Sequence, residues 1–222
     1  MTRAPRLACL GLLVFLGGCG LSDYENRMMQ AQLRHDRFEQ EAKYLAGSVL
    51  LTAVEGKDGT RTNPPLLYFR PPRGISNSPE NPTEPRAGLL YTFRPITAGA
   101  AGPFNAVEIA WALDNSNEFA EKVLRCFSAT SAPAQRLRPI AVPGRDKVTF
   151  ETTEFEDGQH FYSINRWKGD QEQIIIAYWV ILAQKAQASK VIDISLESFA
   201  VMKDGAKLQA LTRSPLEAPP SR

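Results

Sequence analysis

The longest apolar run outside the N-terminal segment is Ile174-Ile175-Ile176-Ala177-Tyr178-Trp179-Val180-Ile181-Leu182. A continuous apolar run of this length is typical of a strand that is buried on both faces. It is too short to cross a bilayer as a helix, which takes about 20 apolar residues. Because a strand of this kind needs covering elements on each side, the run predicts the centre of a layered domain.

Other segments carry weaker strand patterns. We expect strands at Leu66–Arg70, Leu89–Arg94, Ala106–Asn115, Val148–Phe155 and His160–Trp167. The last two form a predicted hairpin that turns at Glu156-Asp157-Gly158. In Ala106–Asn115, apolar residues alternate as far as Leu113 and Glu108 lies on the opposite face, which predicts a half-buried strand.

Helical patterns flank and interrupt these strands. Helices are expected from about Tyr24 to Leu45, from Ser116 or Asn117 to about Ser128, and from Lys185 to Val201. We expect a mobile or polyproline-like surface loop at Pro71–Arg86 and a connector at Pro133–Arg145. The predicted class is therefore α+β, an antiparallel sheet sandwiched by helices and preceded by a long N-terminal helix.

The order of these elements resembles a known family. A strand, a helix, further strands and then a closing helix with Ile194-Ser195-Leu196-Glu197-Ser198-Phe199 look like the PsbP/DcrB-type α/β/α sandwich, over about residues 85–205. Several proteins of that type are envelope or lumenal lipoproteins and scaffold subunits. The resemblance implies a non-enzymatic adaptor, and it supplies no binding residues.

The N-terminus resembles a bacterial lipoprotein signal peptide. Arg3 and Arg6 make a positive region, Leu7–Gly18 is apolar, and Leu16-Gly17-Gly18-Cys19 matches a lipobox. We expect the mature protein to begin at Cys19 and to be held to a membrane by acyl chains on that thiol. The residue after the cysteine is Gly20 rather than Asp, which in lipoproteins implies transfer to an outer membrane, on its periplasmic face. The alternative is an ordinary secreted protein with an incidental cysteine.

These patterns divide the chain into four parts. Residues 1–18 are the expected signal peptide, 19–46 the lipid anchor and N-terminal helix, 47–208 the sandwich domain and 209–222 a disordered tail. The net charge of the whole chain is +2, and removal of the two signal-peptide arginines brings the mature chain to neutrality. A neutral chain argues against nucleic acid as a partner.

The N-terminal helix carries one regular stripe. Its members are spaced alternately by four and three: Tyr24, Met28, Ala31, His35, Phe38, Ala42 and Leu45. Such spacing can form a coiled coil with a partner. The other interpretation is a helix that lies on its own domain or acts as a spacer, and we favour it because alanine and histidine pack poorly in a coiled-coil interface.

Four arginines define the candidate ligand site. They lie near the ends of the predicted strands Leu66–Arg70 and Leu89–Arg94, which have similar sequences and carry Tyr68, Phe69, Tyr91 and Phe93. The four are Arg70, Arg73, Arg86 and Arg94. If the two strands pair, a basic and aromatic surface results, which could bind an anionic small molecule, an envelope polymer or a protein. The alternative, which we favour, is that these arginines merely flank aromatic residues of the core.

Other reactive side chains form no recognisable motif. Cys126 and His160 could in principle act as nucleophile and base, but a lone cysteine near an apolar helix face is more often a small core residue. The acids Glu151, Glu154, Glu156 and Asp157 could hold a hard cation or form an ordinary solvated turn, and we favour the turn. We expect no catalytic residue, no metal site and no cofactor.

Together these patterns predict a membrane-anchored envelope lipoprotein that acts as a non-enzymatic protein-interaction or scaffold module. The alternative is a binding module for an anionic ligand on the four arginines. The identity of the partner and the oligomeric state are left open by the sequence.

Overall fold

A computed structural model describes residues 6–51, 54–55, 61–62, 66–80, 89–97, 102–127, 132–140, 148–169, 171–203 and 207–209. The fold is α+β. Its largest element is a six-stranded antiparallel sheet. In spatial order the strands are β5 (Leu89–Phe93), β6 (Phe104–Ala112), β10 (Gln173–Ile181), β9 (His160–Lys168), β8 (Val148–Glu156) and β7 (Ala134–Ile140).

Strand β10 lies inside this sheet, between β6 and β9. Ile176 is opposite Ile109 of β6 on one side and Asn165 of β9 on the other. Residues 173–178 of β10 are all buried, although alternate side chains point to opposite faces. The prediction of a strand buried on both faces is confirmed.

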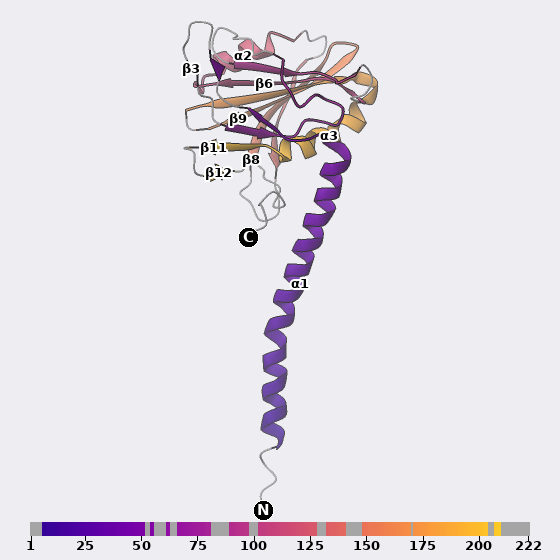
Figure 1. Cartoon of the computed structure of the whole chain (residues 1–222), viewed down its shortest axis with the longest axis vertical. Coiled ribbons are helices and arrows are strands. Elements are labelled where there is room, and N and C mark those ends of the chain that lie inside the picture. The colour runs from indigo at the N-terminus through magenta and orange to yellow at the C-terminus, as the bar shows by residue number, and fades with distance from the viewer. Residues whose placement is uncertain are drawn as a thin grey trace, which may run out of the picture.

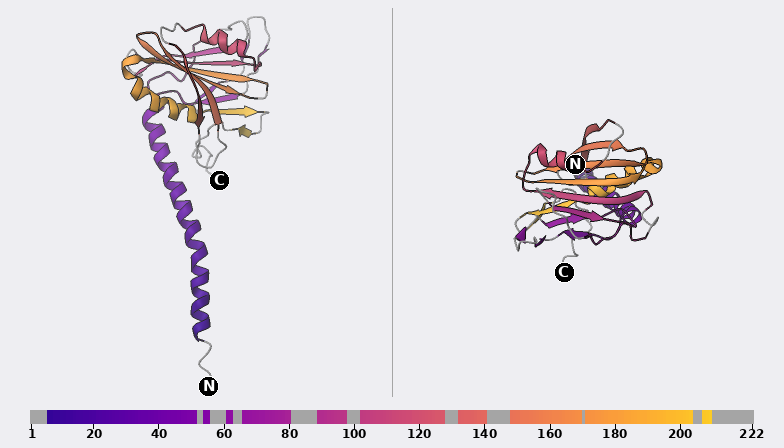
Figure 2. Two further views of the ribbon diagram at one scale, coloured as in Figure 1. Left: turned by 180° about the vertical axis from the view of Figure 1, so that it is seen from behind. Right: turned by 90° about the horizontal axis from the view of Figure 1, so that it is seen from above.

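A second, four-stranded antiparallel sheet packs near the first (Figure 2). Its spatial order is β1 (Val49–Leu51), β4 (Leu66–Phe69), β11 (Ala200–Lys203) and β12 (Lys207–Gln209). A two-stranded ribbon pairs β2 (Val54–Glu55) with β3 (Arg61–Thr62). The helices are α1 (Arg6–Tyr44), α2 (Asn117–Leu124) and α3 (Lys185–Glu197), and the short 3-10 helix η1 (Leu182–Gln184) precedes α3.

Two separate cores cover the two faces of the large sheet. On one face, α2 places Phe119 and Val123 against Ile175 and Ala177 of β10. On the other face lie α3 and the second sheet. There the ring of Phe69 in β4 is 4.7 Å from that of Phe199 and 5.8 Å from that of Phe93. Helices thus contact both faces, and the second sheet, which the sequence patterns did not predict as a unit, shares one of them with α3.

Several predicted boundaries are wrong. Strand β7 occupies the segment that we expected to be a connector, and its Pro139 lies at the sheet edge, where a missing N–H is tolerated. Leu113 is 71% exposed, because β6 ends at Ala112. The last helix ends at Glu197 rather than Val201, since the chain enters β11 at Ala200.

The segment after β4 is only partly the surface loop that we expected. Pro71 and Pro72 are buried, and Ile75 is fully buried and forms an isolated bridge with Pro95. This part of the loop is therefore packed into the domain. Residues 81–86, and residues 210–222 of the predicted tail, lie outside the described residues, whereas Gln209 ends strand β12 instead of beginning the tail.

Helix α1 projects away from the domain, and only its C-terminal end contacts the other elements (Figure 1). For residues 6–21 the structure describes the backbone alone. A search of the described residues identified no helix with the length and hydrophobicity that a membrane span requires.

The predicted hairpin of β8 and β9 is confirmed, and Asp157 organises its turn. The Asp157 carboxylate accepts hydrogen bonds from the Tyr162 hydroxyl at 2.6 Å and from the amides of Gln159 and His160 at 3.0 and 2.7 Å. Gly158 follows with φ of 91°, a conformation that glycine adopts without strain. The hydrogen bond from Tyr162, followed by the two backbone donors, holds the pKa of Asp157 well below its ordinary value.

Asp157→Asn should therefore destabilise the protein in a pH-dependent manner. A carboxylate whose pKa is lowered by folding contributes stability above its unfolded pKa and loses it as the pH falls through the folded pKa. The melting temperature of the variant should lie below that of wild type at pH 7, and the difference should shrink as the pH falls below the ordinary value of 3.8. Asp36→Asn, at an exposed position of α1, is the control. A difference that is independent of pH would contradict this assignment.

Candidate functional site

An open groove of about 630 Å³ lies beside α2, over the end of the large sheet formed by β7, β8 and β9. Ala120 and Leu124 of α2 form one wall, and Leu137 of β7 lies on the other side. Thr153 and Ile164 also line it. Both apolar and polar side chains line this surface, which suits an amphipathic ligand.

The groove exists because α2 is short. The helix has eight residues and packs over β10 and its neighbours, so it leaves the β7 end of the same sheet face uncovered. The registers place Leu137 opposite Glu151, and Glu151 opposite Arg166, so these side chains share that face. Leu137 is 69% exposed although it lies in a strand.

Arg166 fixes α2 to the sheet at the end of the groove. Its guanidinium is almost fully buried and donates to the side chains of Gln173 at 2.7 Å and Asn117 at 2.9 Å. It also donates to the carbonyl oxygens of Ser116 at 2.9 Å and Asn115 at 3.2 Å, next to the start of the helix. The arginine is thus occupied by the protein itself and has a positioning role.

The remaining charges of the groove are paired. Lys168 lies 3.0 Å from a carboxylate oxygen of Glu151, which is also 3.4 Å from Arg166 through its other oxygen. Arg136 lies 2.7 Å from Glu154. Because each cation has a carboxylate beside it, the groove offers little net positive charge to a polyanion and is better suited to a polypeptide.

A second cluster joins α1 to the domain, and we call it the joint: Arg37, Glu41, Arg70 and Glu197. The Glu41 side chain is 1% exposed and accepts from Arg37 Nε at 2.9 Å and Arg70 Nη1 at 3.0 Å. Arg37 also contacts Glu197 of α3 at 2.8 Å. Burial raises the pKa of Glu197, and the positive charge of Arg37 opposes that rise. Three segments distant in sequence are therefore held by one ionic network.

Hydrogen bonds continue from the joint to the centre of the large sheet. The Tyr178 hydroxyl of β10 donates to Ser195 Oγ at 3.1 Å, and Ser195 Oγ donates to the carbonyl oxygen of Arg70 at 2.9 Å. The Arg70 amide in turn donates to Ser198 Oγ at 3.0 Å. Burial raises the pKa of Tyr178, so the phenol keeps its proton as a donor. The base of α1 is thus tied to the core.

The structure does not assemble the four predicted arginines as the strand-pairing hypothesis required. Strands β4 and β5 belong to different sheets and do not pair. Arg70 lies in the joint, Arg94 makes an exposed ion pair with Glu80 at 3.1 Å, and Arg73 is exposed. Arg86 lies outside the described residues.

The aromatic residues beside these arginines belong to the core where their side chains are described. Phe69 and Phe93 are fully buried and Tyr91 is 3% exposed. This arrangement agrees with the interpretation that we favoured, in which arginines flank core aromatics at strand ends. The structure describes no side-chain environment for Tyr68.

The remaining candidates, Cys126, His160 and His35, each contact a different group. Cys126 is exposed, so the prediction of a buried thiol is wrong: the apolar stripe of α2 continues through Phe127, and Cys126 falls beside it. Its Sγ donates to the Lys122 carbonyl oxygen at 3.4 Å. His160 Nδ1 lies 3.1 Å from Asp157 and His35 is exposed on α1.

The acids near the hairpin each have a partner of their own. Glu154 pairs with arginines of β7, and Glu156 lies 3.0 Å from Lys185. In the part of the chain that the structure describes, no three Asp, Glu, His or Cys side chains gather into a metal-binding group. Glu154 and Asp157 are mostly covered and bonded to the protein itself, so these acids do not form the solvated turn that we expected.

Cys19 falls within α1, where the structure describes the backbone alone, so its modification stays a prediction. The sequence patterns missed Arg166 and the groove. The spacing of four between Arg37 and Glu41 predicts an ion pair on the exposed side of the helix; the pair is confirmed, but its exposure is wrong, because the Glu41 side chain is only 1% exposed. No local pattern indicated that Arg70 would complete the pair.

Glu41→Gln should loosen the attachment of α1. The substitution keeps the shape but removes the negative charge between two guanidinium groups, and breaking such a buried pair costs about 3 kcal/mol of unfolding free energy. Amide hydrogen exchange should accelerate over residues 37–46, measured by mass spectrometry. Glu25→Gln, at an exposed position of α1, should change neither quantity. Unaltered exchange in Glu41→Gln would show that the joint does not hold the helix.

No protein-family model matches the chain, and none of the curated proteins matches it. The function is therefore inferred from the groove, the joint and the N-terminal sequence.

Proposed function

We propose that this chain is a lipoprotein of the cell envelope, anchored by acyl chains on Cys19, whose domain acts as a non-enzymatic adaptor for a partner protein. The lipobox at Leu16–Cys19 supports the anchor, and Gly20 supports an outer-membrane location facing the periplasm. The neutral mature chain leaves the acyl chains as its main means of membrane attachment.

In this proposal the long N-terminal helix is a stalk. The stretch of α1 from Tyr24 to Tyr44 has a length of about 32 Å at 1.5 Å per residue. It begins close to the anchor and ends in the joint. The stalk therefore sets the distance between membrane and domain, and the contacts of Glu41 set the angle.

The adaptor role rests on one observation: edge strand β7 borders the groove and carries an exposed Leu137. Among the described residues, β7 pairs with β8 alone. An edge strand can accept an extended segment of another protein through main-chain hydrogen bonds, with side-chain pockets beside it giving specificity. The partner segment lies along β7 and inserts apolar side chains between Leu137 and Leu124. The paired charges of Arg136, Arg166 and Lys168 disfavour a polyanion here.

The anchor is tested by intact-mass analysis with membrane fractionation of wild type and Cys19→Ser. The wild-type chain should begin at Cys19, carry added acyl mass and sediment with membranes. The variant should lose the acyl mass and most of its membrane association, because a neutral chain has little electrostatic attraction to lipid. A soluble wild type without acyl mass would refute the anchor.

The adaptor role is tested by placing a photo-crosslinking residue at Leu137 in native membranes. One defined partner should be recovered, and Leu137→Glu should reduce its co-purification roughly tenfold, because a charge in a desolvated contact costs more than 1.4 kcal/mol. Ile96→Glu is the matched control, since Ile96 is 71% exposed and lies away from the groove lining. Equal recovery from both variants would contradict a binding role for this groove.

A further inference from the structure

One face of α1 is apolar, regular and exposed. Tyr24, Met28 and Phe38 are 61%, 55% and 50% exposed, and Ala31 and His35 lie between them at spacings of four and three. We call these five residues the α1 seam. Large apolar side chains that remain in water at coiled-coil spacing are typical of a helix that pairs with another helix.

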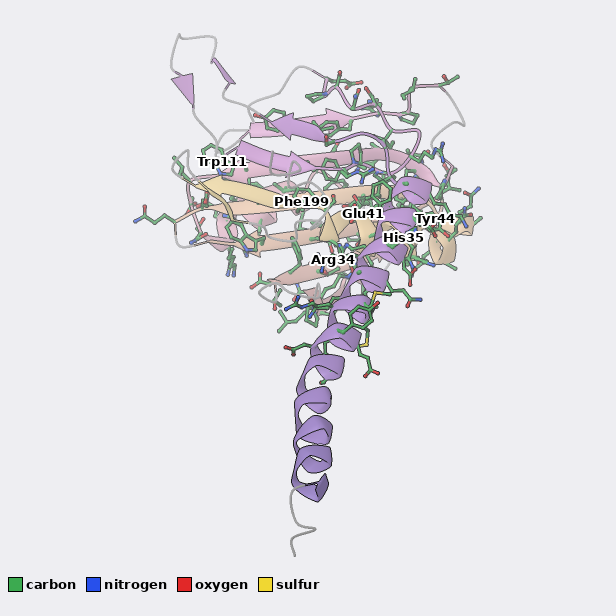
Figure 3. All side chains as sticks on the ribbon, turned by 60° about the horizontal axis from the view of Figure 1, so that its bottom comes forward. Arg34, His35, Glu41, Tyr44, Trp111 and Phe199 are labelled. Carbon is green, nitrogen blue, oxygen red and sulfur yellow. The ribbon has the colours of Figure 1, made fainter. Side chains whose placement is uncertain are left out.

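The domain does not cover this seam. Arg37 and Glu41, which enter the joint, have side chains only 14% and 1% exposed, whereas neighbouring Phe38 is half exposed. The stripe is therefore exposed from Tyr24 to Phe38, whereas its last member, Leu45, is buried in the domain. Figure 3 shows Arg34 and His35 on the helix before it reaches the domain at Glu41 and Tyr44.

We infer that the α1 seam pairs with the seam of a second copy of this chain, as a parallel, two-stranded coiled coil in register. The inference rests on the proposed lipid anchor for its orientation. The seam supplies the interface positions, and the residues on either side of it supply the specificity.

Charge complementarity identifies the second copy as the occupant. With Met28 and His35 at the a positions and Ala31 and Phe38 at the d positions, Arg34 takes a g position and Glu39 the following e position. In a parallel, in-register pair, a g residue faces the e residue of the next heptad on the other helix. Arg34 of each copy therefore faces Glu39 of the other, which gives two opposite-charge contacts. An antiparallel pair would not bring g and e residues together in this way.

Arg34 and Glu39 make only weak contacts within their own helix, so they can exchange these contacts for ones with a second copy. Arg34 Nε donates to the Gln30 carbonyl oxygen at 3.1 Å on the exposed surface. Glu39 lies 3.8 Å from His35, and both side chains are 69% exposed. Exposed ion pairs of this kind contribute little to stability, so breaking them to pair two copies would cost little free energy.

Anchoring explains how a short seam can suffice. The seam covers about two heptads, and isolated coiled coils of that length are marginal in water. Acyl chains on Cys19 would place both helices on one membrane, pointing the same way and at high effective concentration. A polar residue at an a position, here His35, weakens a coiled coil but specifies its register and strand number.

Cysteine trapping in native membranes tests the interface. Full-length chains carry Ala31→Cys, on the seam, or Leu33→Cys, off the seam but equally on α1, each with Cys126→Ser because Cys126 is exposed. Mild oxidation should give a covalent dimer with Ala31→Cys and roughly tenfold less with Leu33→Cys. Equal yields, no dimer, or trapping of Ala31→Cys to a different protein would overturn the inference.

Charge exchange tests the register. Arg34→Glu alone and Glu39→Arg alone should each reduce the trapped dimer roughly tenfold, because both contacts become repulsive. Co-expression of the two variants with different tags should restore a mixed dimer, in which each Glu again faces an Arg. Failure of the mixed pair to recover would overturn the parallel arrangement.

Fractionation of the same samples separates the two proposals. A membrane-bound chain that gives no seam-specific dimer contradicts the coiled coil and leaves the lipid anchor standing. A soluble chain contradicts the anchor and, with it, the orientation on which the coiled coil depends.

Discussion

The layering of the domain follows from the apolar side chains on both faces of β10. Ile175 and Ala177 must be covered from one side and Ile176 and Tyr178 from the other, because burial of apolar area is the main favourable contribution to folding. Short α2 meets the first requirement, whereas α3 and the second sheet meet the other. The buried Tyr178 hydroxyl also needs a partner, and Ser195 supplies it, which links β10 to the joint.

The predictable part of the fold is the part that local patterns encode. Strand β10 and the hairpin at Asp157 can be predicted from the sequence, because apolar runs and turn residues are patterns of a few neighbouring residues. The second sheet cannot be predicted in this way. Its strand β4 pairs with β11, which follows it by more than a hundred residues, and no short sequence pattern indicates such a pairing. Strand β7 was missed because its proline and its charged residues are typical of a connector as well as of an edge strand.

The candidate site was less predictable than the fold. Of the arginines that were singled out, Arg70 enters the joint, and its role depends on Glu41, to which nothing in the sequence near Arg70 points. The groove exists because α2 is too short to cover the whole sheet face and because β7 forms the edge of that sheet. The sequence patterns did not predict β7. The role of Arg166 was equally unpredictable. A lone arginine in a strand pattern does not indicate that its side chain will bond to the start of a helix almost fifty residues before it. Sites assembled from distant segments carry no periodic signal.

The joint connects the two proposed interfaces, the α1 seam and the β7 edge, through a continuous set of contacts. Glu41 holds α1 to Arg70, and Arg70 is bonded through Ser195 to the central strand, so the helix and the sheet should move together. If α1 pairs with a second copy, two domains are then held in a fixed relation, and so are their β7 edges. A partner with two suitable segments would bind both edges with an affinity well above that for one, because the second contact becomes intramolecular. A flexible linker in place of α1 would place the same two domains on the membrane, but it would dilute that effect by allowing them many separations.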